Sequence, residues 1–75
     1  MELQEFVKKF EEQLDDLEPG TLTADTRFRE LSEWDSMSSL AVIAMVDHEM
    51  KRQISGDDIL NSNTIADLYN NIRNK

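Results

Sequence analysis

The stretch EWDSMSSLAVIAMVDHEM, residues 33 to 50, contains seven consecutive apolar residues from Leu40 to Val46. Asp35 stands before this run and can serve as a helix N-cap, because its carboxylate can accept N–H bonds from the first turn. Lys51 and Arg52 follow it, and the negative end of a helix dipole favours cations there. The stretch therefore predicts a helix over residues 36–52. It is the most apolar segment of a chain of 75 residues that is otherwise strongly polar.

The predicted helix is apolar on more than one side. When it is wound at 100° per residue, one side collects Val42, Ile43, Val46 and Met50. The other side collects Met37, Leu40, Ala41, Ala44 and Met45. We expect the first side to be core and the second to be partly exposed, because small and flexible side chains suit a surface that adapts to partners. The alternative is that the long loop before the helix covers the second side.

An amphipathic segment and a long loop precede this stretch. The stripe Leu3, Phe6, Val7, Phe10 and Leu14 predicts a helix over residues 2–15. Pro19 and Gly20 then break the helix and open a loop, which Leu22, Phe28 and Leu31 should tie to the core.

The C-terminal part shows two helix starts. Residues 55–60 resemble a short capped turn, and Thr64 with Asp67 predicts the start of a last helix. No stretch alternates as a strand would. We therefore expect an all-α fold, a small bundle of three main helices plus one short helix, in a single domain over residues 1–75.

The charge balance limits the kinds of partner. Asp and Glu number 16 against 8 Lys and Arg, which gives a net charge of −8. Nucleic acids and anionic membranes are disfavoured by this sign, whereas a basic protein partner is favoured, although the charge could serve solubility alone. The absence of Cys excludes disulfides and thiol catalysis. The N-terminus lacks the pattern of a signal peptide and the apolar run is too short to span a bilayer, so we expect a cytoplasmic protein without stable membrane insertion. We also expect it to be a monomer.

The motif Asp35-Ser36-Met37, within this layout of helices and loop, resembles the Asp-Ser-Leu signature of acyl carrier proteins and the related peptidyl carrier domains. The resemblance covers essentially all 75 residues. It implies that Ser36 carries a phosphopantetheine arm as a phosphodiester, installed from coenzyme A by a separate transferase that uses magnesium. The arm's thiol would hold acyl cargo as a thioester, and Asp35 would help the transferase to engage the site. A helix N-terminus near the phosphate is physically favourable.

The resemblance also implies a slot for lipid cargo and a surface for partner enzymes. The residues placed to line the slot are Val42, Ile43, Val46, Ile54, Ile59, Leu60, Ile65 and Leu68, for each of which ordinary core packing is the competing role. The residues placed to meet the transferase and the enzymes that load or transfer acyl or aminoacyl groups are Asp35, Met37, Leu40, Ala41, Met45, Asp47 and His48.

The sequence departs from the family pattern in three places. Met37 replaces Leu, a swap that conserves volume. Trp34 is a large residue that we expect to pack on the first helix, and the alternative is that it helps to frame the arm. The outer side of the long helix carries fewer acids than many fatty-acid carriers present there. This indicates a carrier for a specialised fatty-acid, polyketide or acyl-modification pathway. The alternatives are a peptidyl or aminoacyl carrier and an unmodified helical adaptor that grips a partner helix. An enzyme is excluded by the lack of any nucleophile–base set, and no metal site is expected.

Overall fold

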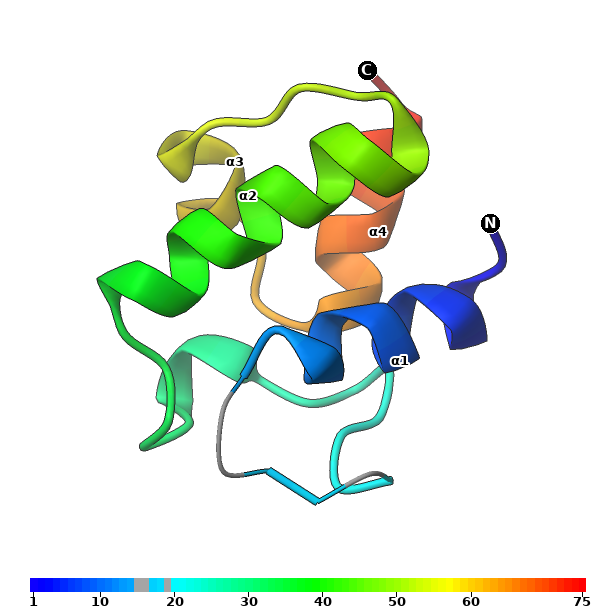
Figure 1. Cartoon of the computed structure of the whole chain (residues 1–75). Coiled ribbons are helices and arrows are strands. Elements are labelled where there is room, and N and C mark those ends of the chain that lie inside the picture. The colour runs from blue at the N-terminus through cyan, green and yellow to red at the C-terminus, as the bar shows by residue number, and fades with distance from the viewer. Residues whose placement is uncertain (15–16, 19) are drawn as a thin grey trace.

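The computed structural model describes residues 1–14, 17–18 and 20–75. Within these residues the chain forms four α-helices, one 3-10 turn and no strand (Figure 1). The elements are α1 (Leu3–Glu12), η1 (Phe28–Glu30), α2 (Ser36–Met50), α3 (Gly56–Leu60) and α4 (Ile65–Arg73). The prediction of a small helical bundle, with one short helix and a long loop after the first helix, is confirmed.

The starts of three helices are fixed by the side chains that the sequence places there. The carboxylate of Asp35 accepts the Ser38 N–H at 2.8 Å, which satisfies one of the unpaired donors of the first turn of α2. Reciprocal capping boxes open the other two, with Ser55 and Asp58 at α3 and Thr64 and Asp67 at α4. The helix starts are therefore properties of the local sequence.

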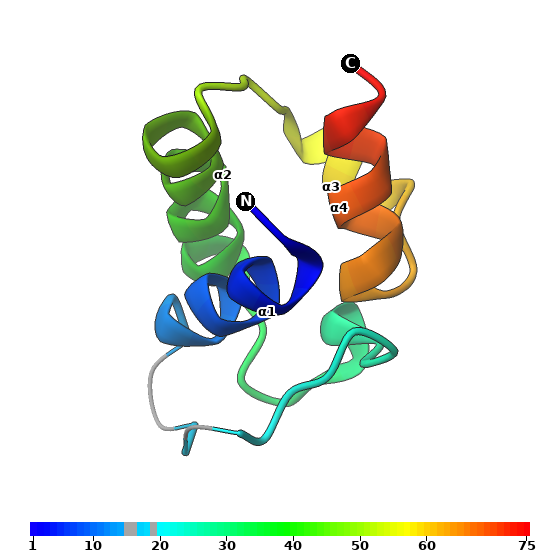
Figure 2. The same cartoon turned by 90° about the vertical axis from the view of Figure 1, so that its right-hand side faces the viewer.

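The four helices are arranged as a ring in which each element packs on two others. Helix α1 contacts α2 and α4, and α3 contacts the same two helices. Figure 2 shows α2 and α4 on opposite sides of the molecule, with α1 crossing between them. Residues 20–35, the described part of the chain before α2, pass below these helices and place η1 below α4.

The core is built around aromatic side chains. Phe6, Phe10 and Phe28 are fully buried. The rings of Phe10 and Trp34 are stacked with centroids 5.7 Å apart, and Phe28 meets both of them edge-on. Such pairs contribute about 0.5–1.5 kcal/mol beyond the area that they bury. The prediction that Trp34 packs on the first helix is confirmed, and this packing fixes the end of the loop just before Ser36.

The long loop is ordered by hydrogen bonds as well as by apolar contacts. Leu22 and Phe28 are buried and Leu31 is half-buried, as predicted. The loop carbonyls of Ala24 and Thr26 accept the first N–H groups of α4, from Ala66 at 2.9 Å and Ile65 at 3.2 Å. The loop is thus attached to the first and the last helix. Its side chains pack on α1, and its backbone carbonyls accept hydrogen bonds from α4.

The extents of the first two helices differ from prediction. Helix α1 ends at Glu12, and Asp15 in the predicted range lies outside the described residues. Helix α2 ends at Met50, because Lys51 takes a left-handed conformation with φ 58°. Basic residues are favourable near a helix end whether they lie inside or beyond it, so Lys51 and Arg52 did not locate the end.

The assignment of the two sides of α2 was partly wrong. The buried residues Ser38, Val42, Met45 and Val46 are spaced four, three and one apart, which is one continuous helical stripe. Met45, predicted on the exposed side, is only 5% exposed and belongs to the core. Ile43 and Met50, predicted as core, are half-buried at its margin. Met37 and Leu40 are exposed as predicted.

Candidate functional site

Ser36 is the first residue of α2 and its side chain is exposed. Among the hydrogen bonds of the described residues, none engages its hydroxyl. The neighbouring Asp35 is held in place, because its Oδ1 accepts both the backbone N–H and the hydroxyl of Ser38, at 2.8 and 2.9 Å. These bonds, the Ser38 N–H first, lower the pKa of Asp35 from its usual value. A fixed carboxylate therefore stands beside a hydroxyl that an enzyme can reach.

A groove of about 610 Å³ begins at Ser36 and lies between α2 and α3. Most of its lining is apolar, with Arg29 and Asp35 as the charged members among the described residues. The lining consists of Arg29, Trp34, Asp35, Ser36, Ser39, Leu40, Ile43, Gly56, Ile59 and Leu60. A chain attached to the Ser36 oxygen would start at the lining of this groove.

A second hollow of about 320 Å³ shares Leu40 and Ile43 with the groove. Its other lining residues are Ala44, Asp47, Gln53 and Ile54. The two hollows together follow the outer side of α2 toward its C-terminal end. A flexible attachment at Ser36 would thus find apolar side chains along about half of the helix.

The residues proposed to line a lipid slot fall into two groups. Ile43, Ile59 and Leu60 line the groove, and Ile54 lines its extension. Val42, Val46, Ile65 and Leu68 are fully buried in the core. The structure shows ordinary core packing for this second group, and their role in holding cargo stays a prediction.

The residues proposed for partner recognition differ in their exposure to solvent. Met37 is 78% and Leu40 is 65% exposed, and Leu60 across the groove is 62% exposed. Asp47 and His48 are exposed farther along α2, and Ala41 is half-buried and lines a separate hollow with Met37 and Ser38. Met45 cannot belong to this surface, because it is buried.

Sequence reasoning missed Arg29, which lies in η1, seven residues before Ser36. Its Nε donates to the Ser62 carbonyl at 3.2 Å and its Nη2 to Asn63 Oδ1 at 3.3 Å. These bonds connect the loop to the turn between α3 and α4. No signal in the sequence places Arg29 at the groove, because the contact joins residues more than thirty positions apart.

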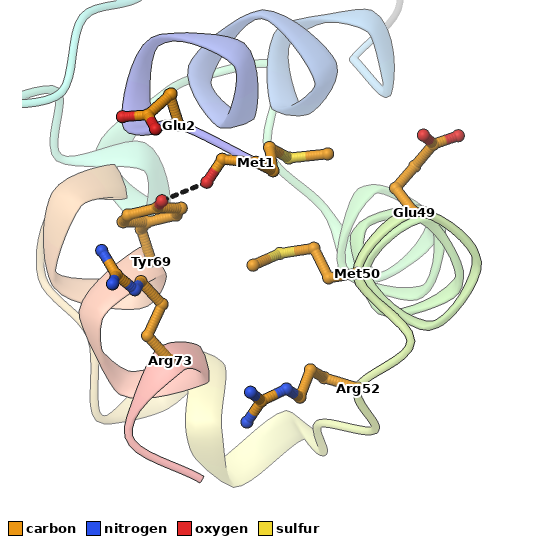
Figure 3. A pocket seen from close by; sticks show the side chains of 7 residues that line it. All are labelled: Met1, Glu2, Glu49, Met50, Arg52, Tyr69 and Arg73. Carbon is orange, nitrogen blue, oxygen red and sulfur yellow. Dashed lines mark hydrogen bonds between the residues drawn. The ribbon is translucent and has the colours of Figure 1, made fainter.

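Another hollow, of about 380 Å³, lies at the opposite end of α2, where Tyr69 donates a hydrogen bond to the Met1 carbonyl (Figure 3). Figure 3 shows Met1, Met50 and Arg52 facing this hollow. Arg52 is already engaged there, since it donates to the Lys75 carbonyl at 2.7 Å. The hollow contains none of the residues that sequence reasoning proposed for the site.

The site thus combines an exposed serine at a helix start, a fixed aspartate and a largely apolar groove. The family described as a phosphopantetheine attachment site matches residues 4–72. The chain belongs to this family, and phosphopantetheine is its covalent cofactor. Carrier domains of this kind are generally non-catalytic and interact with phosphopantetheinyl transferases and acyl-handling enzymes.

Comparison with curated proteins and with solved structures gave no significant match. Among the described residues, no helix has both the length and the apolar character needed to cross a membrane.

Proposed function

We propose that the protein carries acyl or related intermediates on a phosphopantetheine arm attached to Ser36. The observation that supports this most directly is the exposed Ser36 hydroxyl at the mouth of the groove. The residues present fit the arm, because its phosphate would lie at the N-terminal end of α2, which is favourable for an anion. The arm supplies a thiol, which this chain lacks.

Ser36 is favoured over the two other serines of the same segment. The Ser38 side chain is buried, and its hydroxyl already donates to Asp35 Oδ1 at 2.9 Å. Ser39 lines the groove but is half-buried one turn into the helix. A transferase must bring coenzyme A to the attacking oxygen, so the exposed first-turn hydroxyl is the accessible nucleophile.

The test is the intact mass after incubation with coenzyme A, magnesium and a broad-specificity phosphopantetheinyl transferase. We expect a gain of one phosphopantetheinyl group, lost in Ser36→Ala and retained in Ser39→Ala. The Ala variant should stay folded, because Asp35 caps α2 without the Ser36 hydroxyl. Loading of Ser36→Ala would refute the assignment of the residue. No loading of the wild type by several transferases would favour the unmodified adaptor.

The partners that we propose are the transferase and enzymes that contact an apolar surface. Met37, Leu40 and Leu60 are exposed around Ser36, and no basic partner surface is needed to bind them. Asp35, Asp47 and His48 would contribute at the margin of the same surface. An aminoacyl or peptidyl cargo is the alternative within this proposal.

This apolar surface supports a dedicated role in a specialised pathway. The expected outcome is slow elongation of the acyl-loaded protein by a standard fatty-acid ketosynthase, measured beside a housekeeping fatty-acid carrier. Equal rates for the two carriers would contradict this part of the proposal and leave the attachment at Ser36 standing.

A further inference from the structure

Arg29 brings a positive charge to a groove whose other lining residues are mostly apolar, with two serines and one acid. Among the described residues that line the groove, it is the single cation, and Asp35 is the single anion. The chain as a whole has a net charge of −8. In so acidic a protein, a cation beside the proposed attachment residue could serve to bind an anion.

The guanidinium group of Arg29 donates hydrogen bonds to neutral acceptors. Its partners are the Ser62 carbonyl and the Asn63 amide oxygen. By contrast, Arg27 in the same segment pairs with the carboxylate of Glu30 at 3.6 Å. Neutral acceptors orient a guanidinium without cancelling its charge, so Arg29 can still attract an anion.

The support beneath Arg29 is itself fixed. Ser62 is fully buried, its hydroxyl donates to the Asp58 carbonyl at 2.8 Å, and it accepts from Asn71 Nδ2 at 2.8 Å. A guanidinium held in this way loses less conformational entropy when it binds a ligand. Two of its nitrogens are committed to these bonds, which leaves further N–H donors of the five available.

We propose that Arg29 binds an anionic group of the loaded arm in the groove. The inference rests on the proposed attachment at Ser36. Two groups have the required chemistry, the phosphodiester that joins the arm to Ser36 and a carboxylate within the cargo. Either would form a charge-assisted hydrogen bond with the guanidinium, which is exposed and lines the groove.

The experiment compares unfolding of the apo, arm-loaded, acetyl-loaded and succinyl-loaded forms at low ionic strength, after intact mass has shown each loading to be complete. The variants are Arg29→Gln and Arg29→Lys. Arg27→Gln is the matched control, because Arg27 does not line the groove. The readout is the change in Tm on loading, so that any loss of stability from the bonds to Ser62 and Asn63 cancels between forms.

We expect loading to raise the Tm of the wild type and of Arg27→Gln, and this rise to be largely lost in Arg29→Gln and partly kept in Arg29→Lys. An interaction of ordinary strength shifts the Tm of so small a domain by about 4–8 °C. Loss in every loaded form identifies the phosphodiester as the anion. Loss in the succinyl form alone identifies a cargo carboxylate.

The proposal is overturned if Arg29→Gln and Arg27→Gln show the same change in Tm on loading in all forms. If Arg29→Gln does not fold, the test uses Arg29→Lys and compares the ³¹P chemical shift of its loaded arm with that of the loaded wild type. A chemical shift and a rise in Tm that both equal those of the wild type would count against the proposal. A wild type that cannot be loaded would refute the attachment at Ser36 instead, so the two failures are distinct.

Discussion

At the scale of single residues, Glu11 orders the loop that leads to the site. It is a buried acid on α1, and its two oxygens accept the N–H groups of Gly20 and Leu22, each at 2.9 Å. The Leu22 N–H contributes most to lowering the pKa of Glu11, and burial opposes it. A carboxylate that accepts two backbone donors replaces the secondary structure that this segment lacks.

Glu11→Gln should destabilise the protein by about 1–3 kcal/mol at pH 7, because hydrogen bonds to an ionised acceptor are the stronger ones. The folded pKa of Glu11 lies below its usual value of 4.5. The stabilisation is therefore complete above pH 4.5 and is lost as the pH falls through the folded pKa. Urea unfolding of the wild type and the variant, at pH 7 and at successively lower pH, measures this difference.

The control for this prediction is Glu12→Gln, since Glu12 is its exposed neighbour and should have little effect on stability. Asp35 and Asp58 also have lowered pKa values, so acid weakens the wild type through them as well. The difference between wild type and Glu11→Gln removes their contribution. A difference that persists unchanged at acid pH would show that the charge of Glu11 is not the cause.

At the scale of elements, the end of α2 stores a small amount of strain. Lys51 has φ 58° at the residue after the helix, a position where glycine is usual because a Cβ is unfavourable there. The turn is nevertheless needed, since it directs the chain from α2 toward α3 and so sets one wall of the groove.

Lys51→Gly should stabilise the protein by about 0.5–1 kcal/mol, because the relief of the left-handed conformation exceeds the added flexibility of the unfolded chain. Lys51→Ala is the control, since it removes the long side chain and retains the Cβ. Thermal unfolding of the two variants gives the comparison. If both variants shift the Tm equally, the side chain rather than the backbone is responsible.

The same helix shows which features a sequence can predict. Capping residues predicted where α2, α3 and α4 begin, because a cap acts through bonds to the next three residues. Periodicity could not select the core side of α2, because Met37, Leu40 and Ile43 make it apolar in several directions. Which side is buried depends on where α1 and α3 lie, and this placed Met45 in the core.

The candidate site was predictable to a similar degree. The Asp35–Ser36 motif located the attachment residue that we propose, since it is contiguous in the chain. The groove itself and Arg29 could not be predicted, because they depend on how η1, α2 and α3 meet in space. The burial of Glu11 and its bonds to the loop could not be predicted for the same reason, because nothing in the local sequence distinguishes it from its exposed neighbours.

At the scale of the whole molecule, charge repulsion opposes the compact state. The chain has 16 acids and 8 basic residues. The ion pairs of the described residues are partly or fully exposed, such as Lys9 with Glu49 at 3.9 Å, and pairs of this kind contribute little. Folding therefore concentrates negative charge without much internal compensation.

Raising NaCl from about 0.02 to 0.3 M should increase the Tm, because the Debye length then falls from roughly 20 Å to below 10 Å and screens the repulsion. The measurement is thermal unfolding at pH 7. A repeat near the calculated pI of 4.4 is the control, where the net charge and with it the effect of salt should be small. A Tm that falls with NaCl at pH 7 would contradict this account.

The four methionines lie in three different parts of the molecule. Met37 is 78% exposed beside Ser36, Met45 is buried in the core, and Met50 and Met1 face the hollow at the far end of α2. A sample with ¹³C-labelled methionine methyl groups would therefore report on all these regions in one spectrum. Movement of the Met37 resonance alone would register an event at the site, and movement of Met45 would register a change in the core.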